Sequence, residues 1–134
     1  KGGTPESEKA RDFAEDRNAV WDWFCNNFMD YVGKEDEKPY DQSWLLACVA
    51  PRLLYVGSAV DDHWADPTSE FVSTLWASQA WEMLGQTGLV APDKLPEAGD
   101  VWSDGNVGYH MRKGLHYFSR EDWQRLIEFV NTHS

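Results

Sequence analysis

Residues 52–67, RLLYVGSAVDDHWADP, place an apolar run directly before a group of carboxylates. The run Leu53–Val56 is short, uninterrupted and followed by a glycine, which is typical of a strand buried on both faces in a parallel sheet. Asp66 and Pro67 suit the N-cap and the first helical position of the next element. The segment therefore predicts a strand, then a loop with two adjacent carboxylates, then a helix.

Helical and strand patterns alternate along the rest of the chain. Helices are expected at 13–32, 42–50 and 67–84, and a closing helix is expected after the capping-box pattern of Ser119 and Asp122. Strands are expected at 52–56 and 106–111, and a long loop at 86–105. This alternation predicts an α/β fold, with parallel strands between two layers of helices. Two strands do not make a stable open sheet by themselves, and the sequence begins at Lys1 rather than at methionine. We therefore expect residues 1–134 to be the C-terminal portion of a single α/β domain that is incomplete without upstream strands.

The later strand is also followed by a loop with a chemically active side chain, His116. The carboxyl ends of parallel strands meet at one edge of the sheet, where α/β proteins bind ligands. A carboxylate and then a histidine, each after a strand, follow the order of the second half of a Ser–Asp–His triad in α/β hydrolases. A histidine held by a carboxylate can take the serine proton and carry the charge that forms. Asp62 is the preferred acid and Asp61 the alternative, while Asp66 is better explained as a helix cap.

The serine of such a triad is missing from the sequence pattern. None of the serines lies in a Gly-x-Ser-x-Gly turn, which α/β hydrolases use to expose the nucleophile. We therefore expect the nucleophile to lie upstream and the 134-residue chain alone to be inactive as an esterase. No metal site is expected, because His63 with Asp61 and Asp66 lacks the spacing of known zinc motifs. His110 lies within the expected strand, which indicates a structural role.

Composition limits the possible partners. The net charge of −11 argues against nucleic acid and anionic membranes, because both require basic patches. No apolar run approaches the roughly 20 residues of a membrane span, and no signal peptide is visible. Cys25 and Cys48 are too few for a disulfide scaffold. Two buried thiols, or one disulfide in a secreted protein, are both compatible with the sequence.

The chain contains eight tryptophans. Trp64 and Trp102 lie in loop-like sequence, and Trp64, beside the predicted acid, is our candidate for stacking on a sugar ring. The alternative function is a carbohydrate-binding segment that uses Trp64 and Trp102 without catalysis, or a non-catalytic remnant. The other six lie in helix-like segments and are expected to pack in the core or against other helices: Trp21, Trp23, Trp44, Trp76, Trp81 and Trp123.

Four motifs together resemble one enzyme family. They are Asp41-Gln42, LLACVAPR at 45–52, DHWADP at 62–67 and GYHMRKGLH at 108–116. In this order they are similar to the bacterial glucuronoyl esterases of carbohydrate esterase family 15. The resemblance covers most of this chain but only the C-terminal third or so of a family member.

The resemblance implies an α/β-hydrolase fold and a serine-type carboxylic ester hydrolase. Its substrates would be esters that join 4-O-methyl-glucuronic acid on xylan to alcohols of lignin, and no cofactor is implied. By resemblance, His116 corresponds to the catalytic histidine, Asp62 to the acid, and Trp64 to a tryptophan that contacts the glucuronate. A secreted or periplasmic protein that acts on lignocellulose is implied, and we expect a monomer when the protein is complete. The chain departs from the family pattern at Ser43-Trp44 and beside His116, which bears on the substrate more than on the reaction class.

Overall fold

The computed structural model describes residues 26–31, 33–34 and 37–134. The chain divides into two compact units, Lys1–Asp41 and Gln42–Ser134. The first unit contains a short 3-10 helix, η1 (Asn26–Tyr31). Most of the helix expected at 13–32 lies outside the described residues, as do Cys25, Trp21 and Trp23. The second unit contains all the strands of the described residues and the predicted site.

The sheet has three strands in the order β1-β3-β2. The strands β1 (Leu54–Ala59) and β3 (Val107–Arg112) pair in parallel, as predicted. The strand β2 (Val101–Trp102) pairs antiparallel with β3 and lies in the segment that we expected to be a loop. That expectation was wrong at these two residues, because so short a strand is defined by its pairing partner rather than by its own pattern.

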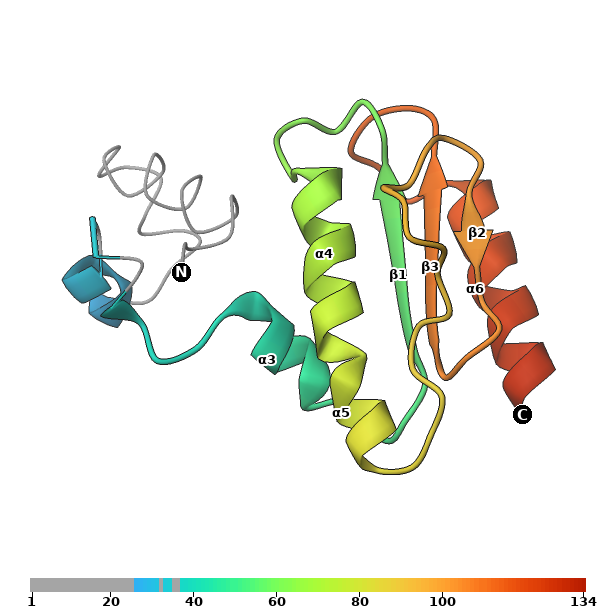
Figure 1. The fold of residues 1–134 in the computed structure, drawn as a ribbon. Helices are drawn as coiled ribbons and strands as arrows, with labels where there is room; N and C mark the ends of the chain where they lie inside the picture. Colours follow the sequence, from blue (N-terminus) through green and yellow to red (C-terminus); the bar gives the residue numbers. More distant parts are fainter. Residues whose placement is uncertain (1–25, 32, 35–36) are drawn as a thin grey trace. The chain divides into compact units, whose positions relative to one another are not determined.

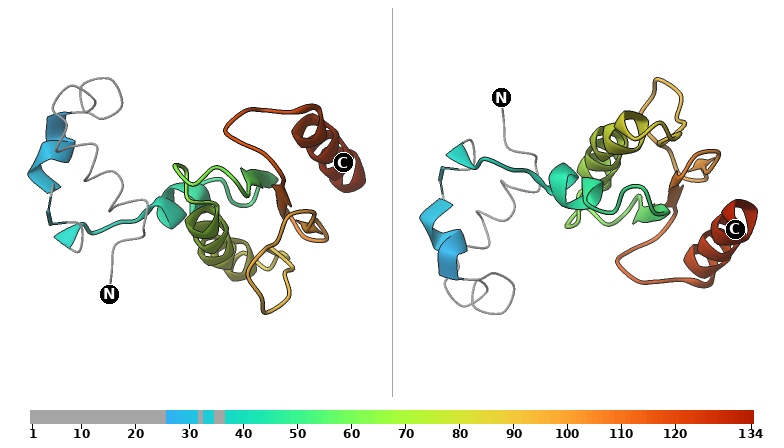
Figure 2. Two further views of the ribbon diagram at one scale, coloured as in Figure 1. Left: turned by 90° about the horizontal axis from the view of Figure 1, so that it is seen from above. Right: turned by 90° about the horizontal axis from the view of Figure 1, so that it is seen from below.

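Helices cover both faces of the sheet (Figures 1 and 2). The helix α4 (Pro67–Ala77) packs on one face of β1 and β3, and α6 (Arg120–His133) packs on the other. The short helix α3 (Gln42–Ala47) packs against α4, and α5 (Gln79–Met83) follows α4 directly. The single helix expected at 67–84 is therefore two helices, divided at Ser78. The result is the expected three-layer α/β/α arrangement.

Two acid side chains fix the starts of the long helices. Asp66 caps α4 from a left-handed backbone conformation (φ 59°), and its carboxylate accepts hydrogen bonds from the backbone and hydroxyl of Ser69. At α6 the capping box forms as predicted: the Ser119 hydroxyl accepts from the backbone N–H of Asp122, and the Asp122 carboxylate accepts from that of Ser119. Such caps satisfy backbone donors that a helix start leaves unpaired.

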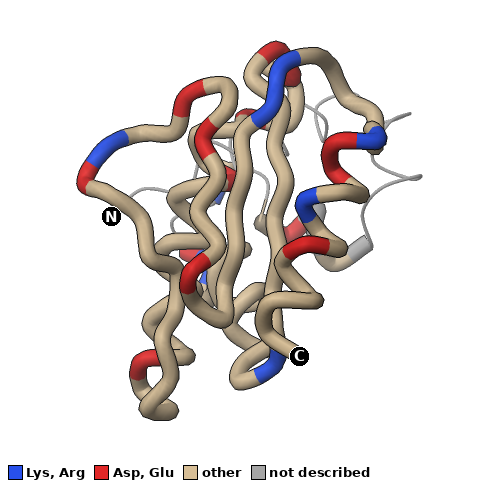
Figure 3. The backbone as a smooth tube through the Cα atoms, turned by 90° about the vertical axis from the view of Figure 1, so that its right-hand side faces the viewer, with Lys and Arg blue, Asp and Glu red and all other residues tan. Residues whose placement is uncertain are grey.

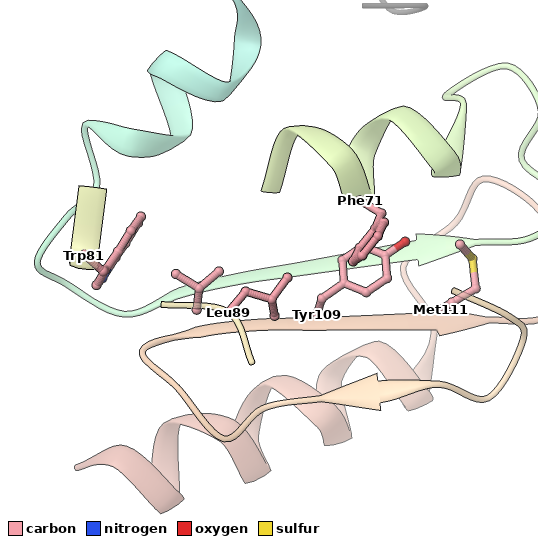
Figure 4. Packing of buried hydrophobic residues seen from close by; sticks show 6 residues of the cluster. Phe71, Trp81, Leu89, Tyr109 and Met111 are labelled. Carbon is pink, nitrogen blue, oxygen red and sulfur yellow. The ribbon is translucent and has the colours of Figure 1, made fainter. Parts of the chain in front are cut away.

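The hydrophobic core lies between the sheet and α4 (Figure 4). Alternate residues of β3 enter it, as the period of a strand requires. Its buried members are Phe71, Trp81, Leu89, Val107, Tyr109 and Met111. Trp81 confirms the expected core role for a helical tryptophan, and its indole N–H donates to the carbonyl of Arg52 at 2.9 Å.

Other helical tryptophans correct the sequence prediction. Trp44, Trp76 and Trp123 are each more than half exposed. Hydrophobicity alone did not show which face of each helix meets the sheet, and exposed apolar side chains are common on protein surfaces. Cys48 is free and exposed, so the expectation of a buried thiol was wrong there.

The face of the sheet under α6 is partly polar. His110 is buried on this face, and its ring stacks against Tyr55 with centroids 5.5 Å apart. The backbone of β1 leaves no room for a side chain opposite this ring, because a Cβ at Gly57 would lie 2.5 Å from Cε1 of His110. Gly57 therefore allows the His110 ring to pack closely over the backbone of β1.

Candidate active site

Two loops leave the same end of the sheet because β1 and β3 run in parallel (Figure 1). Loop A, which we define as residues 60–66, follows β1, and loop B, residues 113–118, follows β3. Backbone hydrogen bonds join loop A to the end of β3 and to loop B: Val60 N–H donates to the carbonyl of Arg112 at 2.9 Å, and Asp61 N–H donates to that of Gly114 at 3.1 Å. Acidic and basic residues meet at this end of the sheet (Figure 3).

Gly114 gives loop B its shape. Its φ of 104° lies in a region that side chains rarely adopt. A Cβ at this position would also lie 2.8 Å from the hydroxyl of Tyr117. The glycine therefore permits the sharp turn that leads into His116.

Loops A and B bring the predicted acid and the predicted histidine together. Nδ1 of His116 lies 2.7 Å from Oδ2 of Asp62. The other carboxylate oxygen of Asp62 accepts from the backbone N–H of Ala65 at 3.4 Å. The Asp62 side chain is only 11% exposed, whereas that of His116 is 73% exposed. Because Nδ1 faces the carboxylate, Nε2 is the ring nitrogen that remains for a reacting group.

The neighbouring carboxylates make different contacts. Oδ2 of Asp61 accepts from the backbone N–H of Gly114 at 3.1 Å, so this side chain fastens loop A to loop B. Asp66 caps α4, as predicted. Of the three carboxylates in loop A, the hydrogen bonds of the structure pair Asp62 with His116.

Trp64 and Trp102, the two tryptophans that the sequence predicts in loops, have different surroundings. The ring of Trp64 meets the His116 ring edge to face, with centroids 6.0 Å apart. Trp64 is 52% exposed. Trp102 is half-buried against the core, with its ring centroid 5.3 Å from that of Phe71. Trp64 is thus the tryptophan beside the Asp62–His116 pair.

A pocket of about 220 Å³ opens beside this pair, and Ser58 and Glu70 line it together with Asp62 and His116. The buried hydroxyl of Ser58 donates to Oε2 of Glu70 at 2.7 Å. Burial raises the pKa of Glu70, and the Ser58 hydrogen bond opposes that rise. Glu70 was not among the predicted site residues, although its place one turn after the Asp66 cap could have indicated a helix face toward the strand.

A second group of polar side chains lies buried under loop B. Nε2 of His110 and Nε of Arg112 both lie 2.9 Å from the carboxylate of Asp122. Burial lowers the pKa of His110. Burial alone would raise the pKa of Asp122, but hydrogen bonds from Ser119, His110 and Arg112 hold it below its usual value. His110 has the structural setting that we expected, whereas no sequence pattern indicated this role for Arg112.

Within residues 26–31, 33–34 and 37–134, no group of three or more His, Cys, Asp or Glu side chains is placed to hold a metal ion. No helix in this described part of the chain combines the length and apolar character that a membrane crossing requires.

Parallel strands, helices on both faces and an aspartate–histidine pair on the loops at their carboxyl ends are the features of an α/β hydrolase. Residues 4–85 match the family model described as "Glucuronyl esterase, fungi". The chain therefore belongs to the glucuronoyl esterase family, carbohydrate esterase family 15.

Individual relatives agree with this assignment. Carbohydrate esterase MZ0003, from an unknown prokaryotic organism, is 42% identical over 83% of this chain and 25% of the relative. The 4-O-methyl-glucuronoyl methylesterase of Podospora anserina is 38% identical over 47% of this chain and 13% of the relative. A promiscuous CE15 esterase from a marine bacterial metagenome superposes with a TM-score of 0.80 at 40% identity, over 87% of this chain and 29% of that structure. The chain thus spans about a quarter of the length of these two prokaryotic relatives.

Proposed function

We propose that this chain supplies the acid–base half of the active site of a serine-type carboxylic ester hydrolase, as the C-terminal portion of a single α/β-hydrolase domain. The observation that carries the proposal is the 2.7 Å contact between His116 Nδ1 and Asp62 Oδ2, with the ring largely exposed. His116 is the general base and general acid, and Asp62 orients it. The nucleophilic serine is provided by a part of the protein outside this chain.

The proposed reaction proceeds in two halves. As the serine oxygen attacks the ester carbonyl, its proton moves to Nε2 of His116, and Asp62 stabilises the imidazolium. His116 then returns the proton to the leaving alcohol when the ester C–O bond breaks, which leaves an acyl-enzyme. In the second half, His116 takes a proton from water, the water oxygen attacks the acyl carbonyl, and the serine leaves with that proton. The product is a free carboxylic acid.

We propose that the acyl part of the substrate is 4-O-methyl-glucuronic acid, esterified to an alcohol in lignin–xylan material. Two observations support this choice: relatives named 4-O-methyl-glucuronoyl methylesterase, and the exposed Trp64 ring beside His116. A flat apolar ring next to the catalytic pair can bury the C–H face of a sugar. Such a substrate lies outside the cell, which favours a secreted or periplasmic enzyme.

The test is a His116→Ala substitution in the full-length protein, with benzyl glucuronate as substrate. Loss of the triad histidine lowers kcat by about 10⁴- to 10⁶-fold in serine hydrolases, and we expect a loss in that range with an unchanged thermal melt. His133→Ala is the control, because His133 lies at the end of α6 and its Nδ1 contacts the carbonyl of Phe129. A well-folded His116→Ala enzyme with near-normal turnover would refute the proposal.

A further inference from the structure

Loop B carries His116, and most of its residues are exposed to solvent. Five of its six residues are exposed: Lys113, Leu115, His116, Tyr117 and Phe118. Within the loop, the described backbone bond runs from Tyr117 N–H to the carbonyl of Leu115, at 3.0 Å. An exposed loop without secondary structure samples several conformations unless other groups hold it. A base that must meet both an acid and a nucleophile needs its position fixed within a fraction of an ångström.

The side chain of Arg112 holds this loop through hydrogen bonds to its backbone carbonyls. Arg112 is the last residue of β3 and is only 5% exposed. Its Nη1 donates to the carbonyl of Lys113 at 3.0 Å, and its Nη2 donates to the carbonyls of Leu115, at 3.2 Å, and Tyr117. The bonded carbonyls lie on both sides of His116 in the sequence. One rigid group therefore fixes the backbone that enters and leaves the histidine.

Two further contacts fix the guanidinium itself. Nε of Arg112 lies 2.9 Å from both carboxylate oxygens of Asp122, the third helical residue of the α6 capping box. Its guanidinium carbon lies 4.4 Å from the centre of the Tyr117 ring, a cation–π contact. The position of loop B is thus tied through Arg112 to the start of α6.

We propose that Arg112 is a positioning residue for His116, because its guanidinium, anchored on Asp122, sets the loop B conformation in which the histidine ring meets Asp62. Arg112 also lines the pocket beside His116, but its donors are directed to loop carbonyls and to Asp122. It therefore acts through the loop and not on the reacting atoms. The inference rests on the proposed function of His116.

The test compares Arg112→Lys with wild type in the full-length protein. Lysine keeps the positive charge beside Asp122 but lacks the planar fork that reaches three carbonyls. We expect kcat for benzyl glucuronate to fall about 100-fold, the loss typical of an ångström-scale misplacement, while KM changes less than about threefold.

The control is Arg125→Lys, the same chemical change on α6, where Arg125 pairs with Glu128. This variant should retain the wild-type kcat and KM. Arg112→Lys with wild-type kcat, or with a loss that appears in KM alone, would overturn the inference. So would a fall in kcat that only matches a fall in the folded fraction, measured by active-site titration and thermal melts.

A second variant tests the positioning role of Arg112 if Arg112→Lys does not fold. Tyr117→Leu removes the exposed ring that the guanidinium contacts, and we expect a smaller loss of kcat, about 3- to 10-fold, with KM little changed. A wild-type kcat in Tyr117→Leu would then overturn the inference. The proposed function is tested separately: if His116→Ala is inactive and Arg112→Lys is normal, only the role of Arg112 fails.

Discussion

Nδ1 of His116 and Oδ2 of Asp62 lie 2.7 Å apart although 54 residues separate them in the sequence. The parallel pairing of β1 with β3 produces this meeting, because it sets Ala59 opposite Arg112 at the ends of the two strands. The two loops that follow then start from neighbouring points. The contact gives the first prediction, which concerns the acid.

An Asp62→Asn substitution in the full-length protein should lower kcat for every ester that the enzyme cleaves. An amide cannot stabilise the imidazolium as a carboxylate does, and it favours the wrong ring tautomer. The loss in serine proteases is about 10⁴-fold, and we expect about 10³- to 10⁴-fold here. The measurement is kcat for benzyl glucuronate and for a simple acetate ester. A silent substitution would place the acid elsewhere, in Asp61 or in a carboxylate outside this chain.

Asp61→Asn provides the matched comparison. Asp61 accepts a hydrogen bond from the backbone of Gly114, and the side-chain oxygen of asparagine can accept the same bond. We expect kcat within about threefold of wild type, because a neutral hydrogen bond replaces a charge-assisted one on an exposed side chain. Steady-state kinetics on the two variants, side by side, give the answer. A large loss in Asp61→Asn with a small one in Asp62→Asn would reverse the assignment.

Local patterns were sufficient to predict much of this arrangement. The compact apolar run before Gly57 gave β1, and the Asp66-Pro67 pair and the Ser119 capping box gave the starts of α4 and α6. These signals are local because a cap or a buried strand is encoded within a few residues. The two loops that carry the predicted acid and histidine followed from the strand ends alone.

Other features depend on partners far away in the sequence. The role of Arg112 could not be predicted from the motif that contains it, because this role depends on a carboxylate ten residues later and on the carbonyls of a loop. The strand β2 depends on the edge of β3 that it meets. The choice between Asp61 and Asp62 depends on side-chain directions, since both residues lie in the same loop. Sequence patterns carry no information about such directions.

The buried His110 predicts a pH dependence of stability. Burial lowers its pKa in the folded state, although the hydrogen bond with Asp122 opposes this. An unfolded histidine takes up a proton below about pH 6.5. The free energy of unfolding is therefore highest above that pH and decreases as the pH falls toward the lowered pKa of the folded state. Asp122, whose pKa is also lowered, contributes stability that is lost only in stronger acid, below about pH 4.

Thermal unfolding at pH 7.5 and pH 5.0 tests this prediction in the full-length protein. His110→Gln removes the titrating group while its amide can still donate to Asp122. We expect wild type to lose more in Tm between the two pH values than His110→Gln does, whatever the Tm of the variant at pH 7.5. Equal losses would show that His110 does not become charged on unfolding in this range.

The last prediction separates substrate binding from catalysis at Trp64. If its ring packs on the glucuronate, it contributes about equally to the ground state and the transition state, and its loss appears in KM. An aromatic contact is worth about 0.5–1.5 kcal/mol, so Trp64→Ala should raise KM for benzyl glucuronate about 3- to 10-fold. A simple acetate ester has no sugar ring, and its KM and kcat should change less than about twofold. The ring of Trp64 also meets the His116 ring edge to face, so a different result is informative: an equal fall in kcat for both esters would mean that Trp64 orients the histidine and does not bind the sugar.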